Sequence, residues 1–131
     1  MRALVVTLAA ALLSGGVAHA AEMVQAEAGV LRWIDRLTGE TGDMELARGQ
    51  SATNGRLTIT MDECRYPVDN PAGDAEAHLT ISDSMRSAPV FSGWMVASSP
   101  ALSALDHPRY DVWVLSCVYP AAPATPPAEG E

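Results

Sequence analysis

Short stretches in which apolar and polar residues alternate run along much of this 131-residue chain, and they limit its fold more than any other feature. Alternation puts every second side chain on one face, which suits a β-strand with one buried face. Turn-forming residues separate the stretches, and Asn54-Gly55 is the strongest such pair. The expected strands cover residues 30–37, 44–46, 56–61, 77–82, 90–96 and 109–118. The pattern predicts a mainly β fold, a small antiparallel sandwich or barrel of about six strands.

The segment before the last expected strand predicts one short helix. Ser99 is a good N-cap residue, and Pro100 suits the first helical position. Leu102 and Leu105 lie three positions apart and would form an apolar edge. His107-Pro108 would end the helix, which therefore lies in the loop leading to the last strand.

The first twenty residues have the organisation of a secretory signal peptide. Arg2 provides a basic start, residues 3–13 are almost entirely apolar, and Ala18-His19-Ala20 provides a small-x-small cleavage site. The apolar run is shorter than the roughly 20 residues that a membrane-spanning helix needs, so no stable membrane anchor is expected. Cleavage between Ala20 and Ala21 would release a periplasmic protein.

Composition divides the remaining chain into three parts. Residues 21–29 are expected to form a flexible leader, and residues 30–119 a single β-rich domain. Residues 120–131 are rich in Pro and Ala and contain no large apolar side chain, so they are expected to be a disordered tail.

The chain is acidic, with sixteen Asp and Glu against eight Lys and Arg and a formal net charge of −8. Loss of Arg2 with the signal peptide would make the charge one unit more negative. Such a charge repels the phosphates of nucleic acids and anionic lipids. No nucleic-acid partner is therefore expected.

The chain contains two cysteines, Cys64 and Cys117. An even number in a small exported chain most simply means one disulfide, whereas a redox pair or a metal site are the alternatives. The chain has no C-x-x-C sequence, and no metal or other cofactor is expected. Because Cys64 alternates in phase with the outward Thr58 and Thr60, a β-bulge near Asp62-Glu63, or a strand that ends before Cys64, would be needed to turn it inward.

The loop of residues 97–108 is the candidate binding region. A hairpin between two apolar strands needs only two to five connecting residues, and long connections on a rigid scaffold often bind partners. We expect this loop to dock an unidentified protein of the cell envelope. The candidate binding residues in and beside it are Trp94, Ser98, Ala104, Asp106, His107 and Tyr110. Trp113, by contrast, is expected to pack in the core against the disulfide.

Two other functions compete with this non-enzymatic one. Ser99, His107 and Asp111 are the residue types of a serine hydrolase, but no G-x-S-x-G sequence accompanies them, and no catalytic residue is assigned. Trp94 and Tyr110 could instead line the groove of a glycan-binding module.

Residues 91–117 resemble the bacterial family called domain of unknown function 2155. The matching elements are Phe91-Ser92-Gly93-Trp94-Met95, Ala97-Ser98-Ser99-Pro100, Leu102, Ala104-Leu105, His107-Pro108, Tyr110-Asp111-Val112-Trp113 and Cys117, with weaker matches at Asp35-Arg36-Leu37-Thr38-Gly39 and at Gly55-Arg56-Leu57-Thr58-Ile59-Thr60 before Cys64. The resemblance implies a small exported protein without established activity. It supports the periplasmic location and the disulfide, and it supplies no catalytic residues.

Overall fold

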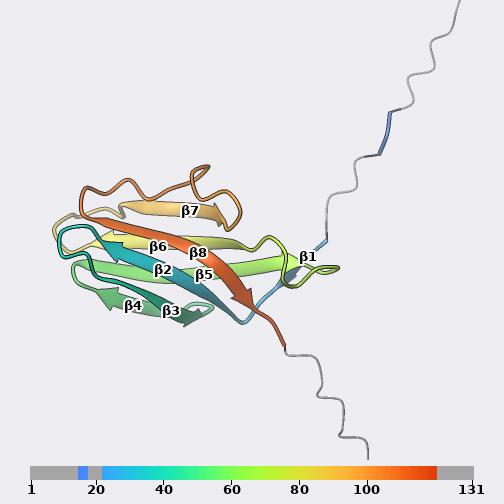
Figure 1. Ribbon diagram of the computed structural model, residues 1–131, viewed down its shortest axis with the longest axis horizontal. Coiled ribbons are helices and arrows are strands. Elements are labelled where there is room, and N and C mark those ends of the chain that lie inside the picture. The colour runs from blue at the N-terminus through green and yellow to red at the C-terminus, as the bar shows by residue number, and fades with distance from the viewer. Residues whose placement is uncertain (1–14, 18–21, 121–131) are drawn as a thin grey trace, which may run out of the picture.

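The computed structural model describes residues 15–17 and 22–120 (Figure 1). The expected signal peptide, its cleavage site at Ala20 and Ala21, and the expected tail beyond Pro120 lie outside these residues, apart from 15–17. The strands are β1 (Met23–Gln25), β2 (Ala28–Asp35), β3 (Thr41–Ala47), β4 (Ser51–Asn54), β5 (Leu57–Pro67), β6 (Glu76–Asp83), β7 (Phe91–Val96) and β8 (Tyr110–Val118). The mainly β prediction is confirmed.

The strands form two antiparallel sheets. One has the order β1-β5-β6-β7, with β4 also pairing β5, and the other has the order β3-β2-β8. In Figure 1, β2 and β8 lie over β5 and β6, and the buried side chains of both sheets form one core. Within the described ranges the sheets do not close into a barrel, so the sandwich is the correct form of the prediction.

Two short strands were not expected from the sequence. β4 forms a hairpin with β5 around Asn54-Gly55, where Gly55 adopts a φ of 57°. β1 pairs with the end of β5, opposite residues 65–67. The described part of the expected flexible leader, residues 22–29, thus contains β1 and the start of β2, because backbone pairing with β5 and β8 holds it in place.

A β-bulge in β5 turns Cys64 inward. The pairing of β5 with β6 shifts between Met61 and Glu63, which confirms the bulge expected from the sequence. Cys64 is buried, and its sulfur lies 2.08 Å from that of Cys117 on β8, at the distance of a disulfide. The pair therefore links the two sheets. Gly29 of β2 allows this close packing, because a Cβ atom there would lie 2.8 Å from the Cys64 sulfur.

A second register shift, between Val30 and Leu31 of β2, changes which side chains of β8 face the core. In the part of β8 that leads up to the shift, Val112 and Val114 are buried. Trp113 lies between them, is half-buried and pairs with the exposed Arg32. After the shift, Cys117 faces inward. Trp113 is therefore out of phase with the buried Val112 and Val114, but it still packs against the hydrophobic core, and its contact with the disulfide stays a prediction.

Within residues 15–17 and 22–120, no helix combines the length and the apolar character that a membrane crossing requires.

Candidate functional site

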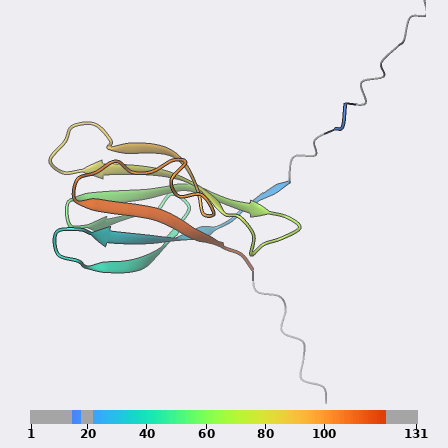
Figure 2. The ribbon, with the colours of Figure 1, turned by 45° about the horizontal axis from the view of Figure 1, so that its top comes forward.

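The loop from β7 to β8 passes above β7 in Figure 1, and in the rotated view of Figure 2 it runs back beside β8. It is not helical, so the predicted helix is wrong. The N–H of Leu102 donates to the Ser99 carbonyl over 3.0 Å, which closes a single turn. The chain then extends, because the buried Leu105 and His107 alternate with the exposed Ala104 and Asp106.

Asp74 fixes the beginning of the loop. Its carboxylate accepts the N–H of Ser98 over 2.9 Å and the Ser98 hydroxyl over 2.5 Å. The N–H of Ala97 donates to the Ala75 carbonyl over 2.9 Å. Ser98 thus holds the loop in place through its side chain.

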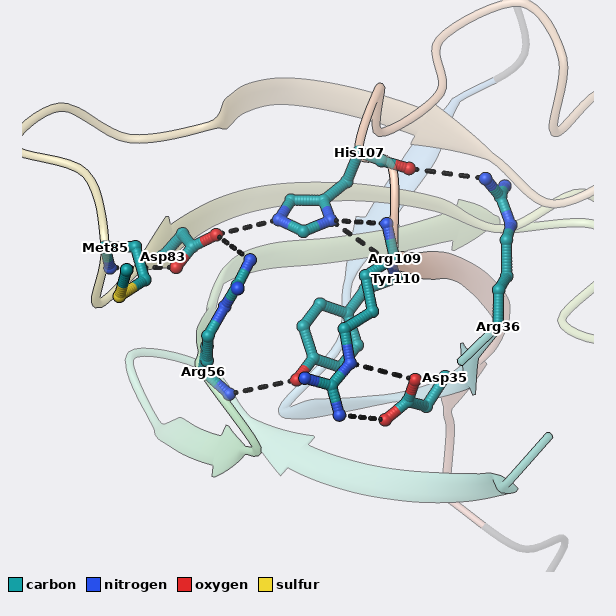
Figure 3. Close-up of polar contacts among 8 residues, drawn as sticks. All are labelled: Asp35, Arg36, Arg56, Asp83, Met85, His107, Arg109 and Tyr110. Carbon is teal, nitrogen blue, oxygen red and sulfur yellow. Dashed lines mark hydrogen bonds and ion pairs between the residues drawn. The ribbon is translucent and has the colours of Figure 1, made fainter. Parts of the chain in front are cut away.

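His107 fixes the end of the loop from inside the sandwich (Figure 3). Its Nε2 lies 2.8 Å from Oδ2 of Asp83, and both side chains are only 1% exposed. Its Nδ1 accepts the N–H groups of Arg109 and Tyr110 over 3.0 and 3.1 Å. Because Nδ1 accepts, the ring proton is on Nε2 and is donated to Asp83. Every polar atom of this imidazole is therefore engaged within the domain.

Asp83 is the buried acceptor that His107 shares with two further donors. Besides His107, its carboxylate accepts the N–H of Met85 over 2.9 Å and Nη2 of Arg56 over 3.0 Å (Figure 3). These donors, with His107 contributing most, lower the pKa of Asp83 to about 2. The Tyr110 hydroxyl accepts the N–H of Arg56 over 3.2 Å, and the Tyr110 ring is part of the core. Tyr110 is thus a structural residue and not part of a binding surface.

A second ion pair holds the junction between the loop and β8. Arg109 donates two hydrogen bonds to the Asp35 carboxylate, over 3.0 and 2.8 Å. This pairing, aided by the N–H groups of Leu37 and Thr38, lowers the pKa of Asp35 to about 2. Arg36 donates to the His107 carbonyl over 3.2 Å (Figure 3). Both ends of the loop are therefore anchored to the sandwich.

Acid should destabilise the domain through these two carboxylates. Asp35 and Asp83 each have a pKa lowered from 3.8 to about 2 in the folded protein. Their ionised forms therefore stabilise the fold above the unfolded pKa, and this contribution is lost as the pH falls from about 4 to about 2. Urea unfolding across that range should give a steeper loss of stability for the wild type than for Asp35→Asn or Asp83→Asn. An equal dependence of stability on pH in the wild type and in both variants would contradict the lowered pKa values of Asp35 and Asp83.

The structure does not assemble the hydrolase triad. His107 is directed to Asp83, and Asp111 pairs with Arg36 over 3.3 Å. In the described part of the chain, no hydrogen bond joins Ser99 to His107, and the Ser99 N–H belongs to a turn with Val96. A nucleophilic serine needs a base within reach, and His107 has no free nitrogen to act as one.

Trp94 and Tyr110 do not share a groove. Trp94 lies on the outer face of the larger sheet opposite His78, whereas Tyr110 is buried between the sheets. The guanidinium carbon of Arg65 lies 4.1 Å from the centroid of the Trp94 ring, and His78 contacts the ring edge-on. Arg65 thus covers a face of the ring that a sugar would need for stacking.

A groove of about 380 Å³ separates the loop from β8. Pro100, Ala101 and Ala104 line its loop side, and residues 111–113 line its β8 side. Of the six candidate binding residues, Ala104 is the one that borders this groove. Asp106 borders a different hollow, formed with residues 85–90. Trp113, which was expected in the core, also borders the groove. Among the described residues, no cluster of His, Cys, Asp and Glu is arranged to hold a metal ion.

Comparison with known proteins gives a family but no activity. The family described as "Uncharacterized protein conserved in bacteria (DUF2155)" matches residues 29–117. An uncharacterized protein of Rickettsia prowazekii (strain Madrid E) is 26% identical over 102 residues, which cover 76% of this chain and 66% of the relative. The chain thus spans just under two thirds of that relative's length. No solved structure matches the chain.

Proposed function

We propose that this chain, which belongs to the bacterial family DUF2155, is a non-enzymatic periplasmic domain that binds another envelope protein through the loop of residues 97–108. The periplasmic location is supported by the signal-peptide pattern of residues 1–20. It is also supported by the pairing of Cys64 and Cys117, because disulfides persist in oxidising compartments.

One observation carries the binding function: Leu102 is 80% exposed on a loop that is anchored at both ends. Asp74 holds the loop through Ser98, and Asp83 holds it through His107. Leu105, three positions after Leu102, is buried and adds a third anchor. A large apolar side chain on a fixed, exposed support loses little conformational entropy when a partner covers it. This arrangement favours docking over the alternative that Leu102 and Leu105 only close one end of the β structure.

Photo-crosslinking in living cells tests this function. A crosslinking amino acid replaces Leu102 in one variant and Met85 in a control, because Met85 is an equally apolar residue, 73% exposed, on another loop. Position 102 should give one discrete adduct in the periplasmic fraction, on a chain that begins at Ala21. Position 85 should not give it.

A second substitution makes the test specific. Ala104→Arg, on the exposed part of the same loop, should abolish the adduct at position 102 while leaving the melting temperature nearly unchanged. Equal labelling from both positions, or an adduct that survives Ala104→Arg, would contradict docking at this loop.

A further inference from the structure

We infer that the partner also covers the outer face of the smaller sheet, and that it does so with apolar and basic side chains. This inference rests on the proposed function. The smaller sheet has the strand order β3-β2-β8, and its inner face packs on the larger sheet. In Figure 1, β2 and β8 lie in front of β5 and β6, so the outer face is turned toward the viewer. Within the described residues, no further sheet covers this face.

The outer face of β2 carries apolar side chains where a sheet in contact with water is usually polar. Leu31 and Asp35 of this strand are buried between the sheets. Because side chains alternate along a strand, Val30 and Ile34 face outward. Both are half-buried, and neither packs against the core. Two β-branched apolar side chains therefore stay partly in contact with water.

β8 adds two larger apolar side chains to this surface. Leu115 is half-buried and does not pack against the core. Trp113 contacts the core and also borders the groove that Ala101 and Ala104 line from the loop. Since β8 has β2 on one side and this groove on the other, Trp113 joins the two regions. The apolar surface is thus continuous from β2 to the loop that the proposed function assigns to docking.

The outer face of the larger sheet has the opposite character. Its outward residues include Thr58 and Thr60 of β5, which pair with Ser82 and Thr80 of β6. These hydroxyl residues alternate with buried residues along both strands. Threonine forms strands as readily as valine and isoleucine, so strand formation alone does not require apolar side chains on the smaller sheet. Their presence there indicates a face that a partner covers.

The charges on and beside this surface indicate the chemistry of the partner. Arg32 lies on the outer face, but it already donates two hydrogen bonds to Asp43 of β3, over 2.7 and 3.0 Å. Glu45, which pairs with Val30, makes no ion pair with any other described residue. The exposed Asp106 of the loop has no ion pair in that part of the chain either. The unbalanced charge is therefore negative and attracts Lys or Arg of a partner.

The same charge disfavours two other occupants of the surface. A second copy of a chain with a net charge of −8 would bring like charges together. A membrane that contains anionic lipids would repel the chain for the same reason. The occupant that fits is a partner protein that presents apolar and basic side chains together.

Selection of dodecapeptides from a displayed random library on the purified protein tests this inference. Enriched peptides should combine apolar residues with Lys or Arg and should lack Asp and Glu. Fluorescence titration of the synthesised peptides gives their dissociation constants. Because the attraction is partly electrostatic, raising the salt concentration from about 0.05 M to about 0.5 M should weaken binding by about fivefold or more.

Two matched double variants locate the peptide. Val30→Thr/Ile34→Thr gives the smaller sheet the hydroxyl face of the larger one and keeps β-branched residues in β2. It should weaken peptide binding by about tenfold or more. Thr58→Ala/Ser82→Ala changes the outer face of the larger sheet instead, and should alter binding by less than about twofold.

A charge variant separates a lost contact from a lost fold. Glu45→Lys changes an exposed side chain of β3 and leaves every apolar residue in place. It should weaken binding of the basic peptides by about fivefold or more while the melting temperature stays nearly unchanged. Asp69→Lys, the same charge change at an exposed position after β5, should have less than about half of that effect.

The inference and the proposed function can fail separately. Acidic peptides, a library without binders, or equal binding to the wild type and Val30→Thr/Ile34→Thr would overturn the inference, while the adduct at position 102 would still support docking by the loop. A dimer in sedimentation experiments that Ile34→Lys dissociates would replace the partner with a second copy and would also overturn the inference. Absence of the adduct, together with basic peptides that require Val30 and Ile34, would overturn docking by the loop but retain the binding surface.

Discussion

Reduction of the Cys64–Cys117 pair should lower the free energy of unfolding by about 4 kcal/mol. The two residues are separated by 53 positions, and closing a loop of that length restricts the unfolded chain by about this amount. The total stability of such a domain is about 5–15 kcal/mol, so the loss would remove a large fraction of it. Urea unfolding with and without a reducing agent measures the effect.

The double variant Cys64→Ala/Cys117→Ala is the matched control for this prediction. It should already be less stable than the oxidised wild type, and the reducing agent should not change its unfolding midpoint further. Mass spectrometry of the protein purified without a reducing agent, after alkylation, should detect no free thiol. Two alkylated cysteines in that sample, or a wild-type midpoint that ignores the reducing agent, would contradict the disulfide.

Replacement of His107 by Ala should cost about 3 kcal/mol of stability. The substitution leaves the N–H groups of Arg109 and Tyr110 without an acceptor and removes a donor from the buried Asp83. Breaking a buried pair on one side costs about 3–5 kcal/mol, and the remaining contact of Asp83 with Arg56 places the effect at the lower end. Chemical unfolding of the oxidised protein near neutral pH gives the value.

His78 provides the control because it makes the same type of contact in a different setting. It lies 2.8 Å from Asp62, as His107 does from Asp83, but both side chains of the His78 pair are partly exposed. His78→Ala should cost less than about 1 kcal/mol. His107→Asn, whose amide oxygen can replace Nδ1 as the acceptor, should be less harmful than His107→Ala. Equal losses for His78→Ala and His107→Ala would contradict the importance of burial.

Alternation in the sequence predicted the six main strands because each buries one face against the opposite sheet. It missed β1 and β4, since three- and four-residue strands are held by backbone pairing with β5 more than by their own side chains. The alternation put Cys64 on the outward face of its strand, which conflicted with the burial expected of a disulfide cysteine. This conflict correctly indicated a bulge. The shift between Val30 and Leu31 left no such sign: Trp113 and Leu115 are as apolar as Val112 and Val114, so both phases of β8 looked buried.

The loop was misread because one spacing suited two structures. Leu102 and Leu105 suggested a helical edge, but Leu105 and His107, two positions apart, are the pair that is buried together. The partner of His107 could not be predicted from the sequence, because Asp83 lies 24 positions earlier at the end of β6 and only the folding of the sheets brings the two together. Ala104 could be chosen as a candidate binding residue from its position in the loop alone, and it does border the groove.

The pairing of β2 with β8 also governs how the domain acquires its structure over time. The smaller sheet joins a strand near the beginning of the domain to its last strand, and its Asp35–Arg109 ion pair bridges 74 positions. Such non-local pairing slows folding, to milliseconds or seconds in comparable β proteins. A chain that crosses a membrane from its N-terminus would have β2 outside well before β8 arrived. If this chain were exported, the pairing of β2 with β8 could form only after nearly the whole domain had crossed, whereas the β2–β3 hairpin could form earlier.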